Sequence, residues 1–228
     1  KEKYQVSYPP YCLVPFPAEL RMQKGADLKV KTAWNIIAAD GLSNEAEQAR
    51  RVLTERIGNI VNSRQRGTQI TLALDNSLTD DEAYTLAVDA KGVTAKGKTA
   101  RGVFYALMTL DQLLRGNGAT ECADAIPALF ISDKPRTHVR ELMVDPARTF
   151  IPFEDLKAFV PEMARYKLNA MHLHLVDDQA WRIEIKKYPQ LTEQASSRWG
   201  QDDIQMPYKG YYTQEQMREL VKLGAEYH

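Results

Sequence analysis

The feature that most constrains the fold of this chain is a change of sequence pattern near Asp133-Lys134-Pro135-Arg136. Beyond this point two short apolar runs, Val139–Val144 and Ala170–Val176, alternate with two segments of helical periodicity, Phe153–Lys167 and Thr213–Tyr227. Strand, helix, strand and helix in this order predict βαβ units with parallel strands and right-handed crossovers.

The change of pattern also marks a domain boundary, because proline disfavours helix in the residue before it and the surrounding charges indicate exposure. Two βα repeats are not stable alone, since a two-stranded parallel sheet leaves both edges unpaired. A (β/α)8 barrel takes about 250 residues, whereas residues 134 to 228 number only 95. We therefore expect domains at 1–135 and 136–228, the second being the start of a (β/α)8 barrel that is cut off part way, at His228.

Residues 1–135 have the pattern of an α+β domain. A proline-rich stretch at Ser7–Phe16 predicts an extended edge segment, because proline cannot donate to a strand ladder. Asn44 and Glu47 match a capping box at the start of a helix whose periodic apolar residues continue to Ile60 and Val61. Further elements are expected at Thr68–Leu74 (strand), Ala83–Asp89 and Val93–Lys96 (hairpin) and Thr99–Arg115 (helix). A sheet with two helices on one face accounts for this domain.

Composition excludes several classes of protein. The 30 Lys and Arg balance the 30 Asp and Glu, so no net positive field favours nucleic acid as a partner. No apolar run approaches the roughly 20 residues of a membrane span. Cys12 and Cys122 are too few for a disulfide scaffold; two unrelated buried thiols are the simpler reading, and a bridge between them stays open. Oligomeric state is not readable from the sequence.

The carboxyl ends of parallel strands face the functional mouth of an α/β fold, so we look there for chemistry. Arg148 follows the first strand in Asp145-Pro146-Ala147-Arg148, and its guanidinium offers a rigid fork of donors for vicinal hydroxyls or a carboxylate. A salt bridge to a neighbouring loop is the alternative. Asp177 and Asp178 follow the second strand and are candidates for substrate hydrogen bonds or for orienting a catalytic group. A solvated acidic loop or helix cap is the alternative there.

His172 and His174 lie two residues apart on the second strand, which places both imidazoles on one face. Such a pair could bind a divalent metal, but nothing else in the sequence completes a site, so core histidines are favoured. Aromatic residues are dense nearby and suit the apolar face of a sugar ring or simple packing. They are Trp181, Tyr188, Trp199, Tyr208, Tyr211 and Tyr212. The glycine-containing segments lack the spacing of a phosphate loop, which argues against a nucleotide enzyme.

Several segments resemble the β-N-acetylhexosaminidases of glycoside hydrolase family twenty. The strongest match is Tyr166–Glu193, which is similar to the second barrel strand of that family and the loop after it. Arg140–Arg148 resembles the first strand and Gly210–Gln216 the lead into the second helix. Ala83–Val88 and Gly102–Leu107 are similar to the accessory α+β domain that precedes the barrel.

This resemblance implies a retaining exo-enzyme that removes terminal N-acetylglucosamine or N-acetylgalactosamine from glycans, without a cofactor or metal. In such enzymes the acetamido oxygen of the substrate attacks the anomeric carbon, one carboxylate orients it, and an adjacent glutamic acid protonates the leaving oxygen. By the resemblance, Arg148 holds the hydroxyls of the terminal sugar and Asp177 supports the catalytic hydrogen-bond network. A periplasmic, outer-surface or secreted location is implied by the family alone.

The sequence departs from the family pattern in three places. Glu141 stands where glycine is common, and Thr149 where an aromatic residue or histidine usually follows the arginine. The catalytic Asp-Glu pair is missing, because Asp81-Glu82 precedes a strand of the accessory domain and has the context of a solvated turn. We therefore expect the main acid beyond His228 and no activity from these residues alone. A metal-dependent barrel hydrolase using His172 and His174, and a non-catalytic glycan-binding module, remain as alternatives.

Overall fold

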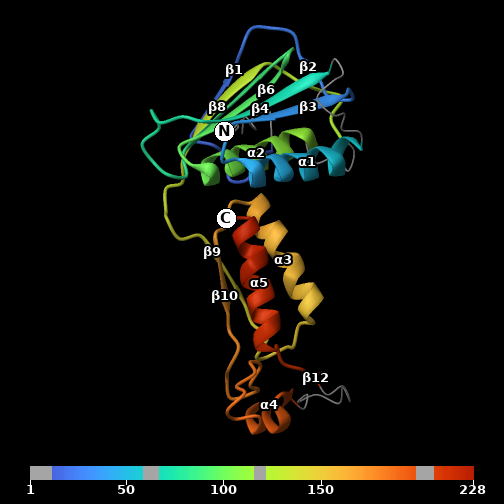
Figure 1. Cartoon of the computed structure of the whole chain (residues 1–228), viewed down its shortest axis with the longest axis vertical. Coiled ribbons are helices and arrows are strands. Elements are labelled where there is room, and N and C mark those ends of the chain that lie inside the picture. The colour runs from blue at the N-terminus through green and yellow to red at the C-terminus, as the bar shows by residue number, and fades with distance from the viewer. Residues whose placement is uncertain (1–11, 59–66, 116–121, 199–207) are drawn as a thin grey trace, which may run out of the picture. The chain divides into compact units, whose positions relative to one another are not determined.

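The computed structural model describes residues 12–58, 67–115, 122–198 and 208–228. The chain divides into two compact units, Lys1–His138 and Val139–His228, coloured from blue to yellow-green and from yellow to red in Figure 1. Within the described ranges no helix is long and apolar enough to cross a membrane.

The first unit is built on a six-stranded sheet in the order β1-β8-β5-β6-β4-β3. The pairs β3/β4 and β4/β6 are parallel, and the remaining neighbours are antiparallel. Its strands are β1 (Glu19–Met22), β3 (Trp34–Ala38), β4 (Thr68–Leu74), β5 (Tyr84–Asp89), β6 (Gly92–Gly97) and β8 (Leu129–Asp133). The strands β2 (Leu28–Lys29) and β7 (Ala125–Ile126) form a separate two-stranded antiparallel sheet.

Helices α1 (Ser43–Ile57) and α2 (Ala100–Arg115) lie side by side on one face of this sheet (Figure 1). The prediction of a sheet with two helices on one face is confirmed. Helix α2 is apolar around most of its circumference, so it can be buried against α1 and the sheet together. Gly97 and Gly102 permit the close approach: a Cβ on Gly102 would lie 2.3 Å from the carbonyl oxygen of Ala83.

Two local predictions for this unit are wrong. Asn44 does not cap α1: the N-cap is Leu42, without a side-chain cap bond, and Asn44 instead donates to Glu45 Oε1 at 3.1 Å. Leu42 is 1% exposed, so apolar burial rather than capping sets the helix start. Residues 12–16 of the expected edge segment form no strand; Val14 exchanges two 2.8 Å hydrogen bonds with the side-chain amide of Gln112. The rest of that segment, and Ile60 and Val61, lie outside the described residues.

In the second unit, β9 (Glu141–Val144) and β10 (Ala170–Leu173) pair in parallel, as predicted. Helices α3 (Phe153–Arg165) and α5 (Gln214–Glu226) lie on the same side of these strands (Figure 1). The loop between β10 and α5 holds α4 (Gln190–Ala195) and the short pair β11 (Ser197–Arg198) and β12 (Tyr208–Lys209).

The core of the second unit is formed by Val144, Leu156, Tyr212 and Leu220. The apolar runs Val139–Val144 and Ala170–Val176 suggest buried strands, but β9 and β10 are only partly buried. Alternation along β9 and β10 sends one set of side chains to the helices and leaves the other set, including Met143 and His172, exposed. Pro161 lies inside α3, which continues through it.

Candidate functional site

A tight turn follows β9 and fixes Arg148. Asp145 accepts the backbone N–H of Arg148 at 3.0 Å through Oδ1 and its guanidinium at 2.5 Å through Oδ2. Aspartate at the first position and proline at the second favour a β-turn in Asp145-Pro146-Ala147-Arg148. The side chain of Arg148 is therefore held by its own turn and remains 52% exposed.

The segment after β10 brings Asp177 to this turn. The second guanidinium nitrogen of Arg148 lies 2.8 Å from Asp177 Oδ2. His174 Nε2 lies 2.7 Å from the same oxygen, and the backbone N–H of Asp178 donates to Oδ1 at 2.8 Å. One carboxylate oxygen is thus shared by an imidazole and a guanidinium.

The charges in this cluster stabilise one another. The hydrogen bond from His174, the N–H of Asp178 and the charge of Arg148 lower the pKa of Asp177 to about 2. Partial burial opposes ionisation of Asp145, but the hydrogen bonds from Arg148 outweigh it and lower the pKa of that carboxyl. The hydrogen bond to Asp145 and the charge of Asp177 raise the pKa of Arg148. Two carboxylates and one guanidinium therefore stay charged together at the carboxyl ends of neighbouring strands.

The structure thus brings Arg148 and Asp177 together. The ion pair between them is also the salt bridge considered as the alternative role for Arg148. Asp178 is exposed and contributes its N–H to Asp177. Of the positions that depart from the family pattern, Glu141 and Thr149 are both exposed.

The expectation of core histidines is wrong. His172 is exposed, and its Nδ1 lies 3.8 Å from Glu141 Oε1. His174 joins the polar cluster through Asp177. The residues of both strands that face the helices are Leu142, Val144, Met171 and Leu173, so the two histidines point to the opposite face. The spacing of three residues between His174 and Asp177 was the available sequence signal for their contact.

The aromatic set divides between packing and surface. Tyr212 is fully buried, donates to the carbonyl oxygen of Ile151 at 2.6 Å and packs on Phe150, so it belongs to the core. Burial raises its pKa to about 12. Trp181 donates to the carbonyl oxygen of Ile183 at 2.6 Å, whereas Tyr188 and Tyr211 are exposed. Trp199 and the side chain of Tyr208 lie outside the described residues.

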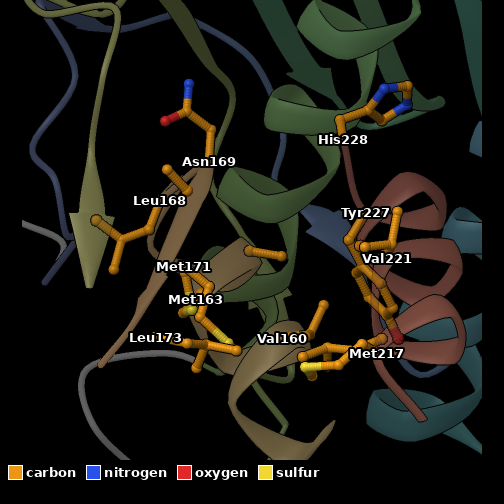
Figure 2. A pocket seen from close by; sticks show the side chains of 14 residues that line it. Val160, Met163, Leu168, Asn169, Met171, Leu173, Met217, Val221, Tyr227 and His228 are labelled. Carbon is orange, nitrogen blue, oxygen red and sulfur yellow. The ribbon is translucent and has the colours of Figure 1, made fainter. Parts of the chain in front are cut away.

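A separate apolar cavity of about 280 Å³ lies on the helix side of β10. Figure 2 shows the side chains that surround it, which come from β10, α3, α5 and the residues next to these elements. Among them are Val160, Met163, Leu168, Met171, Leu173, Met217, Val221 and Tyr227. Because Met171 and Leu173 alternate with His172 and His174, this cavity and the polar cluster occupy opposite faces of the strand.

Three further expectations can be compared with the structure. Among the residues that are described, no three His, Cys, Asp or Glu side chains gather as a metal site would require. Cys12 and Cys122 are both free thiols, and Cys12 is exposed rather than buried. Asp81 is exposed, but Glu82 is 5% exposed and lies 3.3 Å from Arg101, so this pair is not a simple solvated turn.

Family models and curated relatives identify the same family for this chain. Residues 11–134 match the family model described as "Glycosyl hydrolase family 20, domain 2", and residues 138–228 match "Glycosyl hydrolase family 20, catalytic domain". The chain is 41% identical to a beta-hexosaminidase of Porphyromonas gingivalis over 165 residues, which are 70% of this chain and 21% of that protein. It is 44% identical to a beta-hexosaminidase of Akkermansia muciniphila over 146 residues, 64% of this chain and 29% of that protein.

Solved structures agree with the sequence relatives. The GH20 beta-N-acetylhexosaminidase of Streptomyces coelicolor A3(2) superposes with a TM-score of 0.81 at 28% identity, over 97% of this chain and 45% of that one. The GH20 exo beta-N-acetylglucosaminidase of Vibrio harveyi, solved with N-acetylglucosamine, gives 0.81 at 28% identity over 94% of this chain and 34% of that one. The chain thus spans less than a third of the curated relatives named above. The two family models match an accessory domain followed by part of a catalytic domain. This chain therefore belongs to glycosyl hydrolase family 20.

Proposed function

We propose that this chain is part of a retaining exo-β-N-acetylhexosaminidase that removes terminal N-acetylglucosamine or N-acetylgalactosamine from glycans by substrate-assisted catalysis. The observation that carries this proposal is the ion pair of Arg148 and Asp177, which joins the carboxyl ends of two parallel strands in a chain of this family. The carboxyl ends of parallel strands are where α/β enzymes bind their substrates.

In this proposal Arg148 binds hydroxyls of the terminal sugar. Its guanidinium is exposed on one side and fixed by Asp145 on the other, so a sugar can approach donors that are already oriented. Lysine would not replace it, because an ammonium cannot present two parallel donors.

Asp177 is the second residue of the proposed site. With a pKa lowered to about 2, it is ionised at neutral and mildly acidic pH. A permanent carboxylate can accept hydrogen bonds from a sugar hydroxyl or hold a catalytic partner in its protonated form. We assign the proton donor and the residue that orients the acetamide to the part of the protein beyond these 228 residues.

The same proposal includes a (β/α)8 barrel of which β9 and β10 are two strands. The uncovered faces of these strands, with Met143 and His172 exposed, suit the interior of such a barrel. The apolar cavity between β10 and α5 in Figure 2 suits side chains from a further strand and helix. Both features support a barrel, of which these residues supply two strands.

Hydrolysis of an aryl N-acetyl-β-D-glucosaminide tests the proposal. We expect the 228 residues alone to release no aryl alcohol, and the full-length protein to release it, with the β-anomer of the sugar formed first by NMR. Asp177→Asn in the full-length protein should lower kcat/KM by about 10- to 100-fold, the usual effect of losing one hydrogen bond to a charged group. Asp178→Asn is the matched control. Turnover by the 228 residues alone, or equal losses from the two variants, would contradict the proposal.

The location of the protein is a further part of this proposal. Export to the periplasm, the outer surface or the medium is supported by the resemblance to the family alone. Fractionation of source cells, with hexosaminidase activity measured in each fraction, tests it.

A further inference from the structure

We propose that Arg182 is a positioning residue, which sets the Asp145–Arg148 turn at the correct place relative to Asp177. The inference rests on the proposed function, because it assumes that Arg148 and Asp177 bind the substrate together. Arg182 lies in the loop after β10, and its side chain is fully buried.

The guanidinium of Arg182 donates to backbone carbonyl oxygens of three separate segments. Nε donates to Pro146 at 2.9 Å and a terminal nitrogen to Ala147 at 3.3 Å, both inside the turn after β9. The other terminal nitrogen donates to Ser196 at 2.5 Å and to Gly210 at 3.0 Å. These four bonds connect the turn to the end of α4 and to the lead into α5.

The backbone of Arg182 is fixed as well. Its N–H donates to the carbonyl oxygen of Leu175 at 2.9 Å, and its own carbonyl oxygen accepts the N–H of Tyr212 at 2.8 Å. Leu175 precedes Asp177 by two residues, so Arg182 is joined through its main chain to the segment that carries this carboxylate. Its side chain, in contrast, holds the turn that carries Arg148.

The turn is therefore held from two sides. The N–H of Ala147 donates to the carbonyl oxygen of His174 at 3.1 Å, and its carbonyl oxygen accepts from Arg182. Because Pro146 and Ala147 lie between Asp145 and Arg148, displacement of their carbonyl groups moves the guanidinium away from Asp177. The 2.8 Å contact between Arg148 and Asp177 then lengthens.

Arginine is suited to this role for a physical reason. Burying a cation costs several kcal/mol unless its donors are satisfied, and a guanidinium has five donors in a rigid plane. The plane also lies near the ring of Phe150, 5.5 Å from its centroid. Lysine would keep the charge but direct a compact ammonium to fewer of these carbonyl groups, so Arg182→Lys loosens the turn without removing the cation.

The test compares Arg182→Lys and Arg182→Gln in the full-length protein, each with and without Arg148→Ala. Arg140→Lys is the matched control, because Arg140 Nε also donates to a backbone carbonyl, that of Lys167 at 2.6 Å, at the opposite end of the same two strands. The measurements are kcat and KM for the aryl N-acetylglucosaminide, and amide hydrogen exchange of the peptide that covers residues 145–148.

If Arg182 acts through Arg148, Arg182→Lys lowers kcat/KM about tenfold, mainly through KM, and has less than a twofold effect once Arg148 is alanine. Exchange at 145–148 becomes faster in both Arg182 variants and not in Arg140→Lys. Equal losses in the two backgrounds, or unchanged exchange at 145–148, would overturn the inference.

The proposed function fails separately, if the full-length protein does not cleave the glycoside or if Arg148→Ala leaves cleavage intact. In that case the exchange measurement decides the role of Arg182. Faster amide exchange at 145–148 in the Arg182 variants supports the role of Arg182 in fixing the turn, and unchanged exchange contradicts it.

Discussion

Replacement of Tyr212 by phenylalanine should destabilise the second unit by an amount that the structure allows us to estimate. The ring remains and continues to pack on Phe150 and Phe153, so no large cavity forms. The variant loses the 2.6 Å hydrogen bond to the carbonyl oxygen of Ile151, which is left without this donor. Removing one partner of a buried hydrogen bond costs about 1–3 kcal/mol. We expect the free energy of unfolding of this unit to fall by that amount.

The pH dependence gives a second, independent magnitude. Burial raises the pKa of Tyr212 to about 12, whereas tyrosine in an unfolded chain has a pKa of about 10. The protonated phenol is therefore favoured by the folded state. The stability it contributes is complete below pH 10 and is lost as the pH rises towards 12, by an amount on the order of 2–3 kcal/mol. Tyr212→Phe should therefore remove this part of the decrease in the free energy of unfolding between pH 10 and 12.

Urea unfolding followed by fluorine NMR of 5-fluorotryptophan separates the two units. Trp34 reports on the first unit and Trp181 on the second, so the midpoint seen at Trp34 is an internal control. Tyr188→Phe is the matched variant, because Tyr188 is 53% exposed and its loss should change stability by less than about 0.5 kcal/mol. If Tyr212→Phe and Tyr188→Phe shift the Trp181 midpoint equally, the assigned role of the buried hydroxyl is wrong.

Three further predictions concern packing and charge. Gly102→Ala should lower the free energy of unfolding of the first unit by about 1–3 kcal/mol, because its Cβ would lie 2.3 Å from a backbone oxygen, whereas Gly224→Ala meets open space and should not destabilise; urea midpoints of the two variants test this. Asp111→Ala should lower the free energy of unfolding of the first unit by about 2–4 kcal/mol, because this carboxylate is 1% exposed and pairs with Arg56 of α1 and Arg115 of α2. A urea midpoint unchanged from wild type would contradict this. His174→Ala should raise the pKa of Asp177 from about 2 towards 3.8. The stability that the ionised carboxylate contributes above pH 4 is then lost at a higher pH during acidification. The pKa is measured from the side-chain carbon chemical shift of Asp177 against pH, and a midpoint still near 2 would contradict the prediction.

Much of the fold could be predicted from periodicity. Thr68–Leu74 alternates so regularly that the predicted and observed strands have the same bounds, and the hairpin after it was also predicted correctly. The strands Glu19–Met22 and Trp34–Ala38 were missed. The first is largely exposed, and the second is buried mainly through Trp34, so neither shows a clear apolar alternation. Where burial on one face is incomplete, the period of two disappears from the sequence.

The candidate site was predicted in part. Arg148 and Asp177 could be proposed because the ends of parallel strands converge, and their contact follows from the observed pairing of β9 with β10. His174 was assigned to the core, although it lies in this cluster. Arg182 was not singled out at all, because the acceptors described above are main-chain carbonyl groups, which every residue has.

The sequence by itself determined the strand–helix–strand–helix order of the second unit, the helices and the hairpin of the first unit, and membership of the family. These properties depend on local periodicity and on residue identity along the chain. Only the tertiary structure decided that Asp177 shares one oxygen between His174 and Arg148, and that a buried guanidinium joins three distant segments. Such contacts are set by the closure of long loops around a common core, and no pattern of neighbouring residues encodes them.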